Sequence, residues 1–113
     1  MGNQKAQRMT LRSRISIPRT EIAAFCQRWN VVEFALFGSV LRDDFAPDSD
    51  IDVLLTFAPG QVYTFMDLTA IEAELRAIFG RRVDVVDKDA VRASPNYIRR
   101  RAILSAAEVI YAA

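Results

Sequence analysis

The sequence predicts one domain of the α/β or α+β class, in which helices pack on a small mixed β-sheet. Two observations support this prediction. Helical and strand patterns alternate along the chain, an order typical of helices layered on a sheet. The 113 residues are 51% apolar and 26% charged, which suits one compact globular domain.

The N-terminal part predicts an arm, a helix and a strand. Residues 1–17 are basic and are expected to form a flexible arm, so the domain proper would span residues 18–113. A helix over Ile17–Trp29 follows from apolar residues at helical spacing, with Pro18 in its first turn. The apolar, β-branched and aromatic run Val31–Phe37 predicts the first strand, which ends at Gly38.

The remaining elements follow from the same two periodicities and from their breakers. Gly80 sits where the cap of the longest helix belongs, and Pro59-Gly60 ends the preceding strand. The expected order is a helical turn over 39–44, a turn over 46–49, a strand over 50–57, a helix over 63–79, a strand over 82–86, a helical turn over 89–93 and a last helix over 95–111.

Composition excludes several classes of function. The chain has no histidine, which removes Ser-His-Asp triads and most zinc sites, and its single cysteine, Cys26, allows no internal disulfide. Without a disulfide framework the expected location is the reducing cytoplasm. No apolar run approaches the length that spans a bilayer, so no membrane partner is expected. A net charge of +1 gives no support for nucleic acid as the main partner.

Two carboxylates open the second predicted strand. Side chains alternate along a strand, so Asp50 and Asp52 share one face, roughly 7 Å apart, while Ile51 and Val53 point to the core. Two like charges so close repel each other unless a cation lies between them. Magnesium prefers oxygen ligands of this kind together with substrate phosphates, and the pair therefore predicts a metal site.

A phosphate-binding turn is predicted before that pair. Gly38 and Ser39 follow an apolar strand and open a helical turn. Glycine lets the backbone approach a ligand closely, and free N–H groups at a helix start favour an anion. Ser39 adds a hydroxyl and Arg42 adds a guanidinium suited to phosphate oxygens.

A third carboxylate is expected on the third strand, where Asp84 and Asp87 lie on opposite faces. Asp84 is flanked by valines, where an unused carboxylate would be costly to bury, whereas Asp87 ends the strand and is easily solvated. Asp84 is therefore the predicted partner of Asp50 and Asp52.

These residues together resemble the minimal nucleotidyltransferase (MNT) antitoxins of the DNA polymerase beta nucleotidyltransferase superfamily. The resemblance runs from about Thr20 to the C-terminus and rests on an apolar strand followed by Gly-Ser, an arginine, Asp-x-Asp and a later Asp. Asp43 departs from the pattern, because many members have glycine there. The matching residues are Gly38, Ser39, Arg42, Asp50, Asp52 and Asp84.

The resemblance implies a nucleotidyltransferase fold and a two-metal transfer of AMP from ATP. Asp50 and Asp52 would hold two Mg²⁺ ions, and Asp84 would hold the catalytic ion and help deprotonate the attacking hydroxyl. Gly38, Ser39 and Arg42 would bind the β- and γ-phosphates. The implied partner is a HEPN ribonuclease toxin, which accepts AMP on a tyrosine hydroxyl.

Two other functions stay open at the level of sequence. The chain could be an antitoxin that neutralises its toxin by binding alone. It could also be a nucleotidyltransferase acting on a small molecule, although so short a chain is expected to lack an additional substrate lobe.

Overall fold

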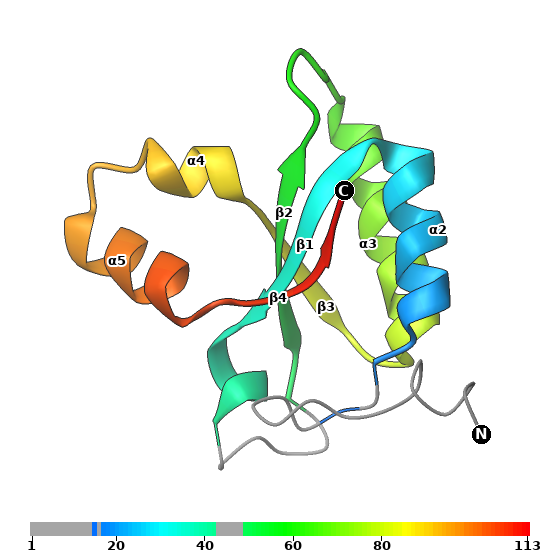
Figure 1. Ribbon diagram of the computed structural model, residues 1–113, viewed down its shortest axis with the longest axis horizontal. Helices are drawn as coiled ribbons and strands as arrows, with labels where there is room; N and C mark the ends of the chain where they lie inside the picture. Colours follow the sequence, from blue (N-terminus) through cyan, green and yellow to red (C-terminus); the bar gives the residue numbers. More distant parts are fainter. Residues whose placement is uncertain (1–14, 16, 43–48) are drawn as a thin grey trace.

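The computed structural model describes residues 15, 17–42 and 49–113, and it places a four-stranded mixed sheet between two helical layers (Figure 1). This confirms the predicted fold class. The strand order across the sheet is β3-β2-β1-β4. The elements are α2 (Arg19–Trp29), β1 (Val31–Phe37), the 3₁₀ turn η1 (Gly38–Leu41), β2 (Ile51–Phe57), α3 (Phe65–Phe79), β3 (Val83–Asp87), α4 (Lys88–Arg92), α5 (Tyr97–Ala106) and β4 (Glu108–Ala112).

Strand pairing places the ends of three strands together. β1 is antiparallel to both β2 and β4, whereas β2 and β3 are parallel and are joined through α3. The C-terminal end of β1 therefore lies beside the N-terminal ends of β2 and β3, where the strands of the sheet end. In Figure 1 this is the lower edge, next to the η1 turn.

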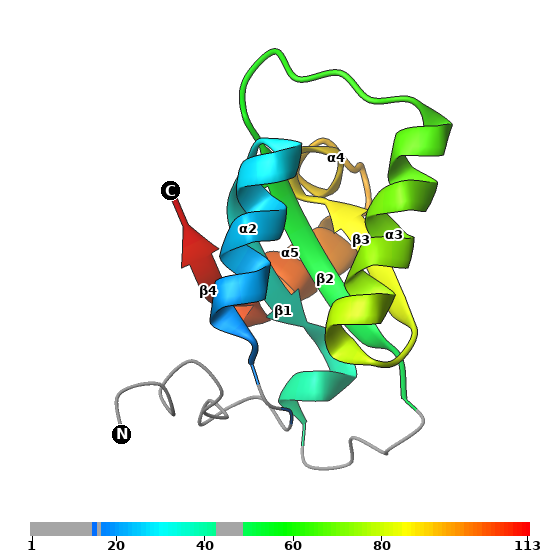
Figure 2. The ribbon, with the colours of Figure 1, turned by 90° about the vertical axis from the view of Figure 1, so that its right-hand side faces the viewer.

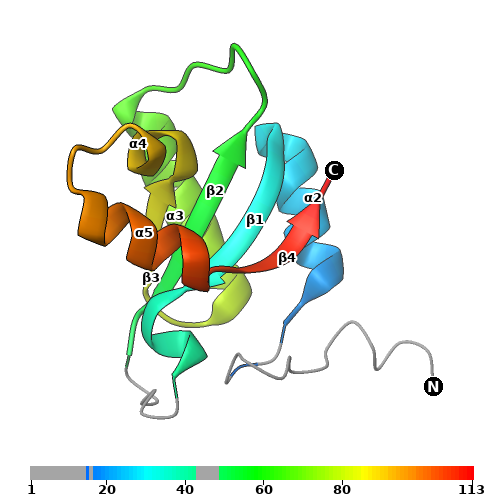
Figure 3. The same cartoon turned by 60° about the vertical axis from the view of Figure 1, so that its left-hand side comes forward.

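Each face of the sheet is covered by a different pair of helices. α2 and α3 cover one face (Figure 2), and α4 and α5 cover the other (Figure 3). Alternation along β2 explains how both faces become apolar, since Ile51, Val53 and Leu55 enter the α2/α3 core while Leu54 joins the smaller cluster under α4 and α5.

Local capping signals decide where the helices begin and end. α3 starts at Phe65 rather than at Tyr63, because the Thr64 hydroxyl accepts from the Asp67 backbone N–H and the Asp67 carboxylate accepts from the Thr64 N–H. Gly80 adopts the left-handed conformation and ends α3 as predicted. Phe65 shares the helical spacing of the buried Ile71 and Leu75, but it is 81% exposed, so the first turn of α3 does not reach the core.

The predicted last helix over 95–111 is wrong in its second half. α5 ends at Ala106, and the chain then forms β4, which pairs with the outer side of β1. Helical spacing over this range would place Ile98 and Ile110 on one inward face, but Ile110 is buried from a strand and Ile98 is 80% exposed. The unpaired edge of β1 supplies backbone partners that a continued helix would leave open, and Arg19 Nη1 donates to the Ile110 carbonyl at 3.0 Å.

Three further expectations concern the core, the arm and the membrane. Cys26 packs in the core as a small apolar residue, and burial raises the pKa of its thiol to about 12. Most of the predicted arm, the predicted turn over 46–49 apart from Ser49, and Asp43 lie outside the described residues, while Ile17 is fully buried in the core. None of the helices in the described ranges is long and apolar enough to cross a bilayer.

Candidate active site

The η1 turn brings the backbone against a carboxylate of the neighbouring strand. Gly38 begins this turn with φ +79°, a backbone conformation that residues other than glycine rarely adopt. A Cβ atom at Gly38 would lie 2.3 Å from Oδ2 of Asp52. Glycine is therefore required here both for the shape of the turn and for room beside Asp52.

The surroundings of Asp52 shift the pKa of its carboxyl away from the ordinary value. Burial raises the pKa of the Asp52 carboxyl, and the negative charges of Asp84 and Asp50 raise it further. The Arg42 guanidinium and a hydrogen bond from the Ser39 backbone N–H act in the opposite direction and lower the pKa. The Gly38-Ser39 turn and Arg42 thus already surround an anionic group.

Asp84 lies beside Asp52 in the parallel register of β2 and β3. Both side chains project from the face that carries Leu54 and Val86, under α4 and α5. The argument from burial that selected Asp84 is wrong, because Asp84 is exposed on an edge strand. Alternation places Asp84 and Asp87 on opposite faces of β3, and the parallel register of β2 and β3 is what puts Asp84 beside Asp52.

Asp87 lies on the opposite face of β3 and has a structural role there. Its carboxylate accepts the Asp89 backbone N–H at 2.9 Å and so caps α4. It also hydrogen-bonds to Tyr63. Burial raises the pKa of the Tyr63 hydroxyl, and the negative charges of Asp87 and Asp89 and this hydrogen bond raise it further.

Of the three predicted metal ligands, Asp50 is the one that forms an ion pair with an arginine. Its Oδ1 accepts a hydrogen bond from Nε of Arg82 at 3.1 Å. Within residues 15, 17–42 and 49–113, no group of three acidic, cysteine or histidine side chains is arranged to hold a metal ion. The structure therefore brings Asp52 and Asp84 together and keeps Asp50 nearby, paired with arginine.

The donor set nevertheless suits Mg²⁺. Asp52 and Asp84 offer only oxygen atoms, and their mutual repulsion is visible in the raised pKa of Asp52. Magnesium commonly binds through one or two carboxylates and completes its shell with waters and substrate phosphates. A cation at this position would relieve the repulsion, and Asp50 could join after release from Arg82.

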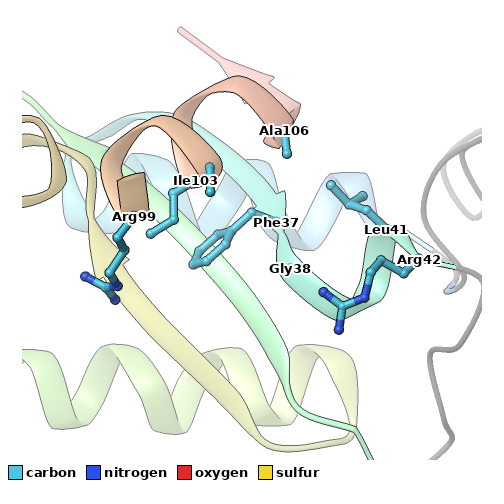
Figure 4. A pocket seen from close by; sticks show the side chains of 8 residues that line it. Phe37, Gly38, Leu41, Arg42, Arg99, Ile103 and Ala106 are labelled. Atoms are coloured by element: carbon cyan, nitrogen blue, oxygen red, sulfur yellow. The ribbon is translucent and has the colours of Figure 1, made fainter. Parts of the chain in front are cut away.

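A pocket of about 500 Å³ adjoins the turn and the carboxylates (Figure 4). Gly38 and Arg42 belong to its wall, and Phe37, another wall residue, is in register with Asp52 across β1 and β2. α5 forms the opposite wall and contributes Arg99. The other lining residues are the apolar side chains of Leu41, Ala102, Ile103 and Ala106.

The α5 wall was missed as part of the site by sequence reasoning. The helical spacing of Ala102, Ile103 and Ala106 predicts one inward face of the last helix, which by itself indicates only a core contact. Arg99 stands at positions i−3, i−4 and i−7 from these residues and thus on the same helical face. The position of Arg99 on this otherwise apolar helical face is the sequence signal that could have indicated a binding site.

The sequence matches the family of nucleotidyltransferase domains over residues 20–108. It is 33% identical over 66 residues to the protein adenylyltransferase MntA of Thermococcus cleftensis, an alignment that covers 58% of this chain. The chain spans 65% of that relative's length, slightly less than two thirds.

Solved structures share the fold. A protein assigned as a minimal nucleotidyltransferase is 31% identical, with a TM-score of 0.61, and the match covers 80% of this chain and 86% of that one. A complex of a tri-AMPylated Shewanella oneidensis HEPN toxin with an MNT antitoxin contains a chain with a TM-score of 0.58 at 15% identity, covering 84% of this chain and 70% of that one. The chain therefore belongs to the nucleotidyltransferase domain family and, within it, to the minimal nucleotidyltransferases.

Proposed function

We propose that this protein transfers AMP from ATP to a tyrosine hydroxyl of a cognate HEPN ribonuclease toxin and thereby acts as its antitoxin. The observation that carries the proposal is the packing of the Gly38-Ser39 turn and Arg42 around Asp52, with Asp84 beside it. The adenylyltransferase relative and the fold shared with an antitoxin of an AMPylated HEPN toxin support this choice of reaction and partner.

The chain's own groups would divide the work as follows. Backbone N–H groups of the η1 turn and the Arg42 guanidinium bind and orient the β- and γ-phosphates. Asp84, exposed on the edge strand, accepts the proton of the attacking hydroxyl. A new bond forms between the hydroxyl oxygen and the α-phosphorus, the bond from the α-phosphorus to the bridging oxygen breaks, and pyrophosphate leaves.

Asp50, Asp52 and Asp84 would hold two Mg²⁺ ions. When bound, the metal supplies positive charge that polarises the phosphoryl oxygens and stabilises the charge that develops on the leaving group. The protein's contribution is to keep Asp52 fixed against Gly38 and in register with Asp84. This function would place the protein in the cytoplasm, where its toxin and ATP occur together.

A contact-only antitoxin is the second candidate. The observation that favours it is the hydrogen bond between Asp50 and Arg82, which occupies one of the three predicted ligands. Under that alternative the protein would protect cells from the toxin without modifying it.

Asp52→Asn separates the two candidates, with Asp87→Asn as a matched control. Both variants exchange a carboxylate for an amide on this sheet, and asparagine preserves the cap of α4 at position 87. The toxin is co-expressed with each variant, and growth, complex formation and the mass of the toxin are measured.

Catalysis predicts that Asp52→Asn still binds the toxin, adds no AMP mass and fails to protect growth, whereas Asp87→Asn behaves like the wild type. Full protection by a folded Asp52→Asn variant, with an unmodified toxin, would refute the transferase proposal and establish the contact-only reading.

A further inference from the structure

The pocket beside the η1 turn has the size and lining of a site for a flat heterocycle. Its volume of about 500 Å³ falls in the range of small-molecule sites. The Phe37 ring forms one wall, and α5 forms the other with Ile103. An aromatic ring and aliphatic side chains favour stacking of a nucleobase, and such stacking is tolerant of the identity of the base.

Arg99 is distinguished from the neighbouring arginines by its contacts. Arg92 pairs with Asp89, Arg100 donates to the Ser94 carbonyl, and Arg101 donates to the Tyr97 hydroxyl. The Arg99 guanidinium has no hydrogen bond or ion pair with any residue that the structure describes.

The position of Arg99 suits one end of an elongated ligand. Figure 4 shows Arg99 and Arg42 at opposite ends of the pocket, with Phe37 between them. A nucleotide whose phosphates lie at Gly38 and Arg42 could therefore extend along Phe37 toward Arg99.

We propose that this pocket receives the purine base of the nucleoside triphosphate and that Arg99 is the residue that reads its edge. The inference rests on the proposed function and adds a base preference to it. The two polar side chains of the lining are those of Arg42 and Arg99, and a guanidinium carries N–H donors and no acceptor atom.

This donor-only lining has a consequence for selectivity. Guanine presents two adjacent acceptors, O6 and N7, which match a guanidinium, whereas adenine presents N7 next to an amino group that is itself a donor. Arg99 thus favours guanine, while the apolar walls accept both purines. The pocket therefore binds GTP as well as ATP, and GTP competes with the ATP from which AMP is transferred.

The test measures equilibrium binding of ATP, GTP and inorganic tripolyphosphate to the full chain in the presence of Mg²⁺. Three variants are compared with the wild type. Arg99→Ala removes the guanidinium, and Ala102→Leu narrows the pocket with a residue that helices tolerate well. Arg101→Ala is the matched control, because Arg101 is an exposed arginine of the same helix outside the pocket lining.

The expected result is a change in base selectivity that leaves phosphate binding intact. Arg99→Ala weakens GTP binding roughly ten-fold and ATP binding less, so that the preference shifts toward ATP. Ala102→Leu weakens both nucleotides, tripolyphosphate binds all variants equally, and Arg101→Ala matches the wild type.

Two outcomes would overturn the inference without touching the proposed function. One is an equal loss of tripolyphosphate and nucleotide binding in Arg99→Ala, which would make Arg99 a phosphate ligand. The other is unchanged nucleotide binding in both pocket variants. Failure of the wild type to bind either nucleotide or tripolyphosphate would instead refute the proposed function itself.

Discussion

The two faces of the sheet are packed to different degrees. Under α2 and α3 lies a continuous apolar core that includes Phe25, Phe34 and Leu36, all fully buried. Under α4 and α5 the buried cluster is much smaller, and Ala102 and Ala106 of α5 remain exposed beside the pocket. The first face holds the fold together, and the second leaves room for a ligand next to Asp52.

This difference follows from the lengths of the helices and from their side chains. α2 and α3 have 11 and 15 residues and present large apolar side chains to the sheet, whereas α4 has 5 residues and α5 turns two alanines toward the site. Substitutions on the two faces should therefore separate stability from activity.

The largest expected effect is on stability, at the α2/α3 face. Phe34→Ala removes a fully buried ring that contacts Phe25 edge-on and stacks with Phe79, and it should cost about 3–5 kcal/mol of unfolding free energy. Ile103→Ala, on the other face, should cost about 2 kcal/mol, the lower end of such changes, because its cluster is small. Chemical denaturation measures both, and equal losses would contradict the asymmetry between the faces.

Asp52→Asn should show the opposite profile. We expect transfer of AMP to fall by roughly 10²- to 10³-fold or more, the scale seen when one electrostatic contact to a transition state is removed. The melting temperature should not fall, because the variant removes a half-buried carboxylate that Asp84 and Asp50 repel. Pyrophosphate release and a thermal melt on the same sample provide both values, and a lowered melting temperature would show that Asp52 is a structural residue.

Gly38→Ala tests the close approach between the turn and Asp52. The added Cβ would meet Oδ2 of Asp52 at 2.3 Å in a backbone conformation with φ +79°. We expect a cost of about 1–3 kcal/mol in stability together with loss of transfer. Gly60→Ala is the control, since it has a similar φ of +81° with no atom within 4 Å of the added Cβ. If both variants lose activity alike, the contact with Asp52 is not the cause.

Asp87→Ala should affect stability alone. Loss of the α4 cap costs about 1 kcal/mol, while transfer remains close to that of the wild type, because Asp87 faces away from Asp52 and Asp84. Asp87→Asn should restore most of the lost stability. A strong loss of AMP transfer in a folded Asp87→Asn variant would show that the active site lies on the face of β3 that carries Asp87, and not on the face that carries Asp84.

The smallest effect concerns the pH dependence of stability. The native state holds the Asp52 proton more tightly than the unfolded state, so the stability of the wild type relative to Asp52→Asn should decrease as pH rises from the ordinary value of 3.8 through the raised pKa. The loss of unfolding free energy that is due to the Asp52 charge is complete above the raised pKa. It vanishes below 3.8, because Asp52 is then protonated in both the native and the unfolded state. Denaturation curves across this range check the sign, and a deficit that grows toward low pH would contradict it.

The sequence alone determined the elements whose signals are local. β1 was predicted with its observed bounds because an apolar run ends at a glycine, and the end of α3 was predicted from Gly80. The common face of Asp52 and Leu54 follows from alternation within one strand. The pairing of Asp84 with Asp52 also required the parallel register of β2 and β3, which was not predicted from the sequence.

Only the tertiary structure decided β4, the α5 wall of the pocket and the partner of Asp50. Residues 108–112 follow a helical pattern closely enough to extend α5, and the open edge of β1 draws them into the sheet instead. The sequence does not show what Arg99 and Arg82 lie against. The structure places Arg99 in the pocket wall together with Phe37 of β1 and pairs Arg82 with Asp50. Local patterns fix which side chains share a face, but the contacts of that face depend on elements distant in the chain.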